Sequence, residues 1–162
     1  MNKAIFLDRD GVLVNNSEHY YIWESVQLKL VDGVVVNLKM LIKKGFKLFI
    51  ISNQGGISRG LYSKNDIEKL HEELIQTFRK NDIEITEISF CPHHPEIEKC
   101  LCRKPDSLMI EKLMAKYKIS KTDSYLIGDS KSDMDAAEKA GICGIQITPN
   151  QNMFPHISSL IQ

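Results

Sequence analysis

The stretch "AIFLDRDG" (residues 4–11) joins a short apolar run to a turn that contains two acidic residues. An apolar run of this length is typical of a buried β-strand, and Asp-Gly is a strong turn signal. Four other short apolar runs follow along the chain. We expect each of them to form a strand: residues 47–52, 84–90, 124–129 and 144–148.

Amphipathic stretches separate these strands and predict helices over residues 33–45, 63–81, 106–118 and 130–141. In the second stretch, Ser63 is a candidate N-cap with Asp66 three residues later. Its apolar stripe consists of Ile67, Leu70, Leu74, Ile75 and Phe78. Alternating strands and helices predict an α/β fold, a Rossmann-like parallel sheet with helices on both faces. We expect a single domain over residues 1–162, ending in a short helix within 149–162.

Polar side chains follow the predicted strands at their carboxyl ends. Asp8 and Asp10 follow the first strand, Ser52 ends the second, and Asp129 ends the fourth. Lys104 comes after the third strand, beyond a segment rich in cysteine and histidine. The carboxyl ends of parallel strands open on one edge of a sheet, where ligands bind. We therefore expect these side chains to share one site.

This set of side chains fits phosphoryl transfer. Carboxylates hold Mg²⁺, which prefers oxygen ligands and commonly bridges to phosphate. Asp8 can act as a nucleophile, and Asp10 can protonate the leaving oxygen and then activate water. Ser52 and Lys104 can hold the phosphoryl oxygens. Each residue alone also fits a structural role, such as a turn at Asp-Gly or a helix N-cap at Asp129. Their predicted convergence on one sheet edge favours the shared site.

The segment "CPHHPEIEKCLCRKP" (residues 91–105) holds three of the four cysteines of the chain. Cys91, His93, Cys100 and Cys102 offer three thiolates and one imidazole, the ligand set of a closed structural zinc site. A disulfide with a spare thiol is the alternative, which a reducing compartment disfavours. We prefer His93 to His94 because it makes the Cys-x-His pair symmetrical with Cys-x-Cys. We expect the zinc to shape a loop that has few apolar residues of its own.

The composition of the chain limits its expected partners and compartment. Lys plus Arg and Asp plus Glu are 21 each, so no global charge indicates nucleic acid or a membrane as partner. No stretch reaches the roughly 20 apolar residues of a membrane span, and the first residues are too short an apolar run for a signal peptide. We expect a cytoplasmic, monomeric protein that acts on a small phosphorylated molecule. Cys143 is expected to be a small buried hydrophobe.

Four stretches resemble the motifs of the haloacid dehalogenase superfamily of phosphohydrolases: "FLDRDGVLV", "IISNQGGISRG", "CRKP" and "YLIGDSKSDMDAAEKAG". The resemblance runs over nearly the whole chain. It implies Asp8 as nucleophile and Asp10 as acid and base, with Ser52 and Lys104 binding phosphate. It also implies Mg²⁺ held by Asp8, the backbone carbonyl of Asp10, and Asp129. Asp133 matches a further acidic residue of the motif. We expect it to support the residues that bind Mg²⁺ and not to bind the metal itself.

Within the superfamily, the Cys/His loop resembles two related phosphatase families, which act on D-glycero-D-manno-heptose 1,7-bisphosphate and on histidinol phosphate. "NQGGISRG" and the paired histidines favour the heptose enzymes, whereas the short insert and short tail are closer to the histidinol type. We expect a Mg²⁺-dependent phosphatase that removes the 7-phosphate of the heptose bisphosphate. Histidinol-phosphate phosphatase is the alternative, and a zinc-stabilised binding module is the alternative without catalysis.

No long insertion follows Asp10 or the second strand, so we expect no cap domain. Substrate choice then falls to short loops, including residues 12–24 with Tyr20, Tyr21 and Trp23. A bisphosphate has a second anionic end, and Arg59 and Arg103 are the candidate cations for it, with Asn53 as a further substrate-binding residue. An ordinary surface role is the alternative for both arginines.

Overall fold

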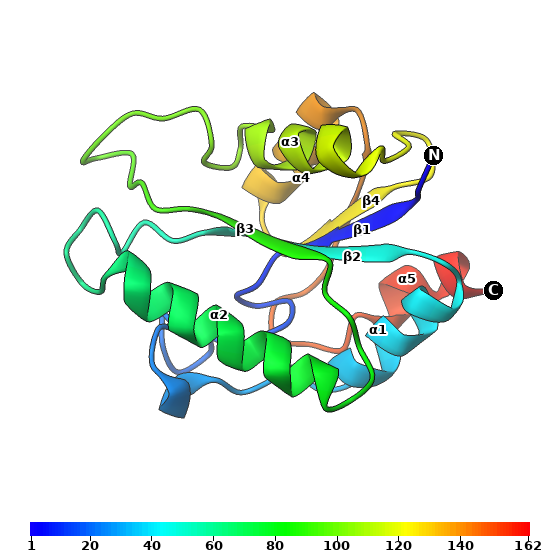
Figure 1. Ribbon diagram of the computed structural model, residues 1–162, viewed down its shortest axis with the longest axis horizontal. Coiled ribbons are helices and arrows are strands. Elements are labelled where there is room, and N and C mark those ends of the chain that lie inside the picture. The colour runs from blue at the N-terminus through cyan, green and yellow to red at the C-terminus, as the bar shows by residue number, and fades with distance from the viewer.

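A computed structural model describes residues 1–162, and its centre is a five-stranded parallel sheet in the order β3-β2-β1-β4-β5 (Figure 1). The strands are β1 (Ala4–Leu7), β2 (Lys47–Asn53), β3 (Glu87–Cys91), β4 (Tyr125–Gly128) and β5 (Cys143–Gln146). All neighbouring pairs are parallel. The predicted fold class is confirmed. The third strand is shorter than expected because residues 84–86 precede the ladder.

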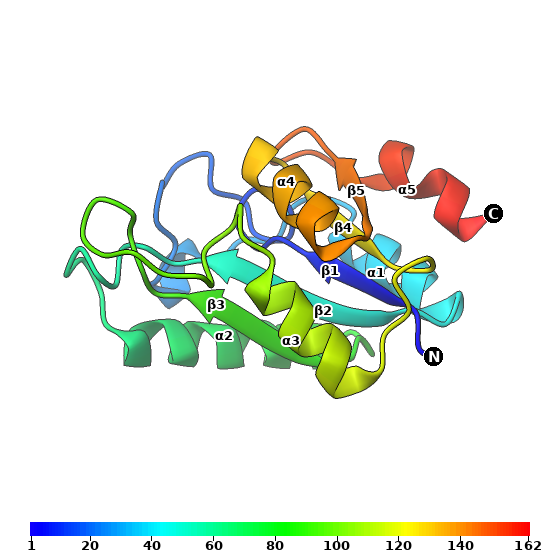
Figure 2. The same cartoon turned by 90° about the horizontal axis from the view of Figure 1, so that it is seen from above.

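Helices cover both faces of the sheet (Figures 1 and 2). They are α1 (Val34–Lys43), α2 (Lys64–Arg79), α3 (Leu108–Tyr117), α4 (Lys131–Ala140) and α5 (Phe154–Ile161), with a short 3₁₀ turn, η1 (Ser25–Gln27). Helices α1, α2 and α5 lie on one face, and α3 and α4 lie on the other. The predicted capping box of α2 is present, since Ser63 and Asp66 satisfy each other's backbone N–H groups.

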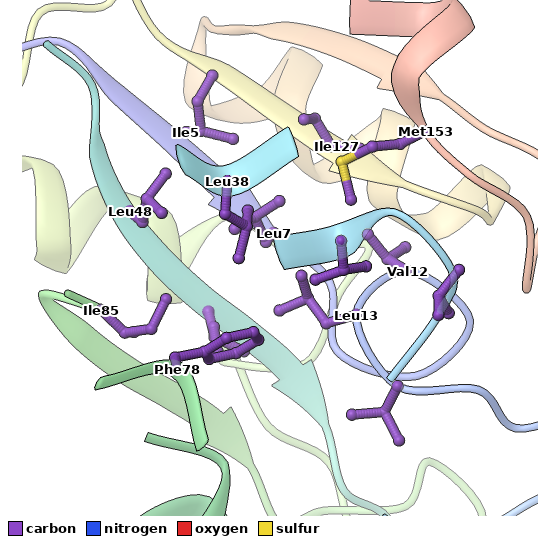
Figure 3. Close-up of a cluster of buried hydrophobic side chains, with 14 of the residues drawn as sticks. Ile5, Leu7, Val12, Leu13, Leu38, Leu48, Phe78, Ile85, Ile127 and Met153 are labelled. Atoms are coloured by element: carbon purple, nitrogen blue, oxygen red, sulfur yellow. The ribbon is translucent and has the colours of Figure 1, made fainter. Parts of the chain in front are cut away.

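Successive residues of β1 face opposite layers of the core, as the period of a strand requires. Ile5 and Leu7 pack with α1, α2 and α5, whereas Ala4 and Phe6 pack with α3 and α4. Figure 3 shows the first layer, in which side chains from the sheet meet Leu38 of α1 and Phe78 of α2. Both faces of the central strands are therefore buried, which explains their uninterrupted apolar sequences.

The order of the strands decides where a ligand can bind. From β1 the chain moves outward to β2 and β3, and it then returns to the other side of β1 to form β4 and β5. Such a reversal leaves a crevice at the carboxyl ends of the two strands where it occurs. Here those strands are β1 and β4, which end next to Asp8 and Asp129. The loop after β3 extends at the end of the molecule opposite the N-terminus in both views (Figures 1 and 2).

Two sequence expectations about peripheral features have different outcomes. The prediction that Cys143 is buried is wrong, because it begins the edge strand β5 and its residue is exposed. The segments that join β1 to α1 and β2 to α2 hold no inserted domain, in agreement with the expected absence of a cap. No helix combines the length and the apolar character that crossing a membrane requires.

Candidate active site

Lys104 joins two carboxylates at the carboxyl edge of the sheet. Its Nζ donates to Asp8 Oδ1 at 2.8 Å and to Asp133 Oδ1 at 2.6 Å. Asp8 directly follows β1, where its backbone N–H still bonds to Ile127 of β4, and Asp133 lies in the first turn of α4. Three elements that are distant in sequence thus converge on one ammonium group.

The backbone of Lys104 is fixed as firmly as its side chain. Asn53, the last residue of β2, donates from Nδ2 to the Lys104 carbonyl and accepts the Lys104 N–H on Oδ1, both at 3.0 Å. Nζ also donates to the Ile51 carbonyl at 3.2 Å. Burial would lower the pKa of Lys104, but the carboxylates of Asp8 and Asp133 outweigh it and hold that pKa above its ordinary value. The lysine is therefore charged and immobile.

Asp129 brings a third carboxylate to this edge, where oxygen atoms of Asp8, Asp129 and Asp133 lie within 4.8 Å of one another. Gly11 makes the approach possible: its φ is +83°, and a Cβ at this position would lie 2.2 Å from Asp129 Oδ2. Burial raises the pKa of Asp8 to about 7 against the charge of Lys104, and burial also raises the pKa of Asp129. Such an arrangement favours binding of a cation, which would stabilise the ionised carboxylates.

The charges of the cluster fit one divalent metal ion. Its carboxylates belong to Asp8, Asp10, Asp129 and Asp133, and the cations that contact them belong to Arg9 and Lys104. When all four carboxylates are ionised, the cluster carries two more negative than positive charges, which one Mg²⁺ would neutralise. The side chain of Asp10 is already held by Arg9 and Gln54. Asp10 is thus free to offer a metal its backbone carbonyl, while Asp8 and Asp129 offer carboxylates.

A cleft of about 300 Å³ opens above this cluster. Among its lining residues are most of those predicted from the sequence: Asp8, Asp10, Ser52, Asn53, Arg103, Lys104 and Asp129. The other lining residues are Asn16, Tyr20 and Tyr21, from the loop 12–24 that was expected to determine substrate choice, together with Gly55, His94, Ser130 and Ser132. Arg59 is exposed and does not line the cleft, so its role as a substrate ligand stays a prediction.

The Cys/His loop brings its four predicted ligands together beside the cleft. Cys91 Sγ lies 3.1 Å from Cys102 Sγ, 3.6 Å from Cys100 Sγ and 3.4 Å from His93 Nδ1. Thiolates around a tetrahedral zinc ion are about 3.8 Å apart for a Zn–S bond of about 2.3 Å, so a small expansion would admit the ion. All four cysteines of the chain are free thiols, which disagrees with the disulfide alternative. These residues fit zinc.

The Cys/His loop also places the side chains of Arg103 and His94 in the lining of the cleft. Arg103 follows Cys102 directly and donates from Nη1 to the His93 carbonyl at 2.9 Å. His94 accepts the Glu96 N–H on Nδ1, and its own N–H bonds to Ser58 Oγ at 2.7 Å. Both side chains lie against Gly55, where a Cβ would approach each of them to 3.1 Å. The loop and the segment after β2 thus form one wall of the cleft.

Several residues of the site were missed because their sequence signals are ambiguous. Arg9 lies between two acids and His71 lies within an apolar helix stripe, yet both are buried and contact each other at 3.2 Å. Gln54 is also buried and bonds to Ser52 Oγ at 2.6 Å. A polar residue on the buried face of a predicted helix, such as His71, was the only signal available from the sequence.

The comparisons with known proteins agree with this geometry. A family model described as HAD-hydrolase-like matches residues 101–152. A D-glycero-beta-D-manno-heptose-1,7-bisphosphate 7-phosphatase from Haemophilus influenzae is 40% identical over 147 residues, which span 88% of this chain and 77% of that protein. A D-glycero-alpha-D-manno-heptose-1,7-bisphosphate 7-phosphatase from Campylobacter jejuni is 38% identical over 140 residues, which span 86% of this chain and 78% of that protein.

A solved structure of a heptose bisphosphate phosphatase also resembles this chain. The D,D-heptose 1,7-bisphosphate phosphatase from B. bronchiseptica, crystallised with magnesium and phosphate, superposes with a TM-score of 0.84 at 25% sequence identity. The match covers 97% of this chain and 86% of that chain. The chain therefore belongs to the heptose-1,7-bisphosphate phosphatase family of the haloacid dehalogenase superfamily.

Proposed function

We propose that the protein is a Mg²⁺-dependent phosphatase that removes the 7-phosphate from D-glycero-D-manno-heptose 1,7-bisphosphate. The observation that carries this proposal is the contact of Lys104 with both Asp8 and Asp133 on the floor of a polar cleft. The names of the related phosphatases support the choice of substrate.

The chain's own residues supply the two halves of the reaction. Asp8 attacks the phosphorus, and a phosphoryl-aspartate forms as the bond to the sugar oxygen breaks. Asp10 gives its proton to that oxygen and then takes one from the water that hydrolyses the intermediate. Lys104 and Ser52 hold the phosphoryl oxygens. Lys104 also neutralises charge on the transferring group, without reorganisation because it is already fixed by Asn53.

Mg²⁺ would be held by Asp8, the backbone carbonyl of Asp10, and Asp129. When bound, it would neutralise phosphoryl oxygens and hold the phosphate in line with Asp8. The related B. bronchiseptica enzyme is described as a complex with magnesium and phosphate, which supports this assignment. Asp133 stays bonded to Lys104 and to the Ser130 N–H and hydroxyl, so it orients the lysine from behind.

The zinc ion would be structural in this proposal. Cys91, His93, Cys100 and Cys102 supply four protein ligands and leave no position for a catalytic water. Glu98 Oε1 lies 3.9 Å from His93 Nε2, the ring nitrogen that does not contact the thiols, so a small movement would let this carboxylate accept a hydrogen bond from the ring. The ion would fix the part of the chain that leads from β3 to Lys104.

A direct comparison of two substrates tests the proposed function. We expect kcat/KM for D-glycero-D-manno-heptose 1,7-bisphosphate to exceed that for histidinol phosphate by at least about 10²-fold, because only the bisphosphate has a second phosphate group that Arg103 can bind. Phosphate release measures the rates, and ³¹P NMR of the product identifies which phosphate remains. A clear preference for histidinol phosphate, or retention of the 7-phosphate, would contradict the assignment.

Arg103 is the candidate contact for the phosphate that is not removed. We expect Arg103→Ala to raise KM for the bisphosphate about tenfold or more, with little change for heptose 7-phosphate, because a lost charged hydrogen bond weakens binding by about 1.5–3 kcal/mol. Steady-state kinetics on both substrates measures the difference. Arg79→Ala, at the exposed C-terminal end of α2, is the matched control. Equal effects of Arg103→Ala on both substrates would contradict the role.

A further inference from the structure

The guanidinium group of Arg9 is fully buried and uses every nitrogen in a polar contact. Nε donates to Asp10 Oδ1 and Nη2 to Asp10 Oδ2, each at 2.9 Å. Nη2 also donates to the Ile22 carbonyl at 2.6 Å, and Nη1 lies 3.2 Å from His71 Nε2. Such a forked pair fixes both the position and the plane of a carboxylate.

His71 supports Arg9 from the buried face of α2. Its ring packs edge-on against Phe90, with ring centroids 5.3 Å apart. Arg9 donates to His71 Nε2, so that nitrogen must carry a free lone pair. Burial, with the charge of Arg9, lowers the pKa of His71 to about 3, which keeps the ring neutral. The histidine is thus an acceptor that holds the arginine in place.

Gln54 adds a third donor to the same carboxylate. Its Nε2 lies 3.2 Å from Asp10 Oδ2 and 2.6 Å from Ser52 Oγ. The amide cannot be reversed without loss, because Tyr62 donates to Gln54 Oε1 at 2.7 Å. The Asp10 carboxylate is therefore bound by two buried side chains, Arg9 after β1 and Gln54 after β2.

The hydrogen bonds to Asp10 leave one acceptor position of its carboxylate unoccupied. A carboxylate has about four acceptor positions, two on each oxygen. Oδ2 accepts from Arg9 and from Gln54, whereas Oδ1 accepts from Arg9 alone. The remaining position is on Oδ1, and Asp10 lines the cleft. We infer that Arg9, held by His71 and the Ile22 carbonyl, is a positioning residue that aims Asp10 Oδ1 at the sugar oxygen of the substrate.

This role rests on the proposed function and makes it more specific. In the first step, the proton on Oδ1 passes to the sugar oxygen while its bond to phosphorus breaks and the bond from Asp8 forms. In the second, Oδ1 takes a proton from water as the water oxygen bonds to phosphorus and Asp8 is released. The Ile22 carbonyl belongs to the loop that carries Tyr20 and Tyr21 into the cleft. Arg9 therefore places the acid and one wall of the sugar site together.

The dependence of the rate on the leaving group tests this role. p-Nitrophenolate leaves without a proton, whereas a sugar alkoxide needs one. We expect Arg9→Lys, which cannot bind both carboxylate oxygens, to lower kcat/KM for the heptose bisphosphate about 10²-fold. For p-nitrophenyl phosphate the loss should be less than about fivefold. kcat/KM reports only the steps up to departure of the leaving group, so hydrolysis of the phosphoryl-aspartate does not enter.

A second pair of variants covers the case in which Arg9→Lys fails to fold. His71→Phe removes the acceptor behind Arg9 and keeps an aromatic ring against Phe90, whereas His71→Gln keeps an acceptor. We expect His71→Phe to show the same selective loss for the sugar substrate, and His71→Gln to recover part of it. Equal losses for both substrates at unchanged thermal stability would overturn the role of Arg9. Wild-type protein that releases no phosphate from the heptose bisphosphate would instead refute the proposed function.

Discussion

Replacement of Asp8 by asparagine should abolish phosphatase activity. We expect Asp8→Asn to lower kcat for p-nitrophenyl phosphate in the presence of Mg²⁺ by at least about 10⁴-fold, because an amide cannot attack phosphorus. The loss should not come from unfolding, since Lys104 keeps its bond to Asp133 and an amide oxygen can replace Asp8 Oδ1 as its second acceptor. Phosphate release and a thermal unfolding curve measure the two quantities on the same preparation.

Asp135→Asn is the matched control, because Asp135 lies on the same helix as Asp133 but pairs with the exposed Lys131. This variant should retain the wild-type rate. Appreciable activity in Asp8→Asn would exclude Asp8 as the nucleophile. A wild-type protein inactive towards every phosphate ester would favour the alternative of a zinc-stabilised binding module.

The sequence carried enough information for the sheet because its signals are local. Short apolar runs and capped amphipathic helices predict the order of the elements, and the parallel topology then brings Asp8, Asp129 and Lys104 to one edge. The Cys/His ligands converge as predicted for the same reason, since each pair is separated by a single residue. Cys143 was misjudged because an apolar neighbourhood does not distinguish a central strand from the edge strand β5.

The network around Asp10 was beyond sequence reasoning because it depends on tertiary contacts. Arg9 and His71 are 62 residues apart, and nothing in either local pattern links them. Asn53 was expected to bind substrate, yet the structure shows it clamping the backbone of Lys104 as well as lining the cleft. Side chains behind a reacting group are selected by the packing of several elements, so a motif does not reveal them.

Removal of one thiol ligand should expose the role of the Cys/His loop. We expect Cys100→Ser to reduce bound zinc from about one ion per chain to below about 0.1, because a hydroxyl is a poor ligand for this ion. Arg103 and Lys104 directly follow the cluster, so kcat/KM for the heptose bisphosphate should fall at least about tenfold as the loop that carries them loses order. Metal analysis, steady-state kinetics and limited proteolysis of the loop measure these effects.

Cys143→Ser is the matched control for that experiment, because Cys143 is exposed on β5 and is not part of the cluster. It should keep wild-type zinc content, activity and resistance to protease. Fully active wild-type protein that contains no zinc after purification without added metal would contradict the structural role of the ion. If Cys100→Ser lost zinc but kept full activity, Lys104 would be held by Asn53 and its two carboxylates alone, and the loop would serve another purpose.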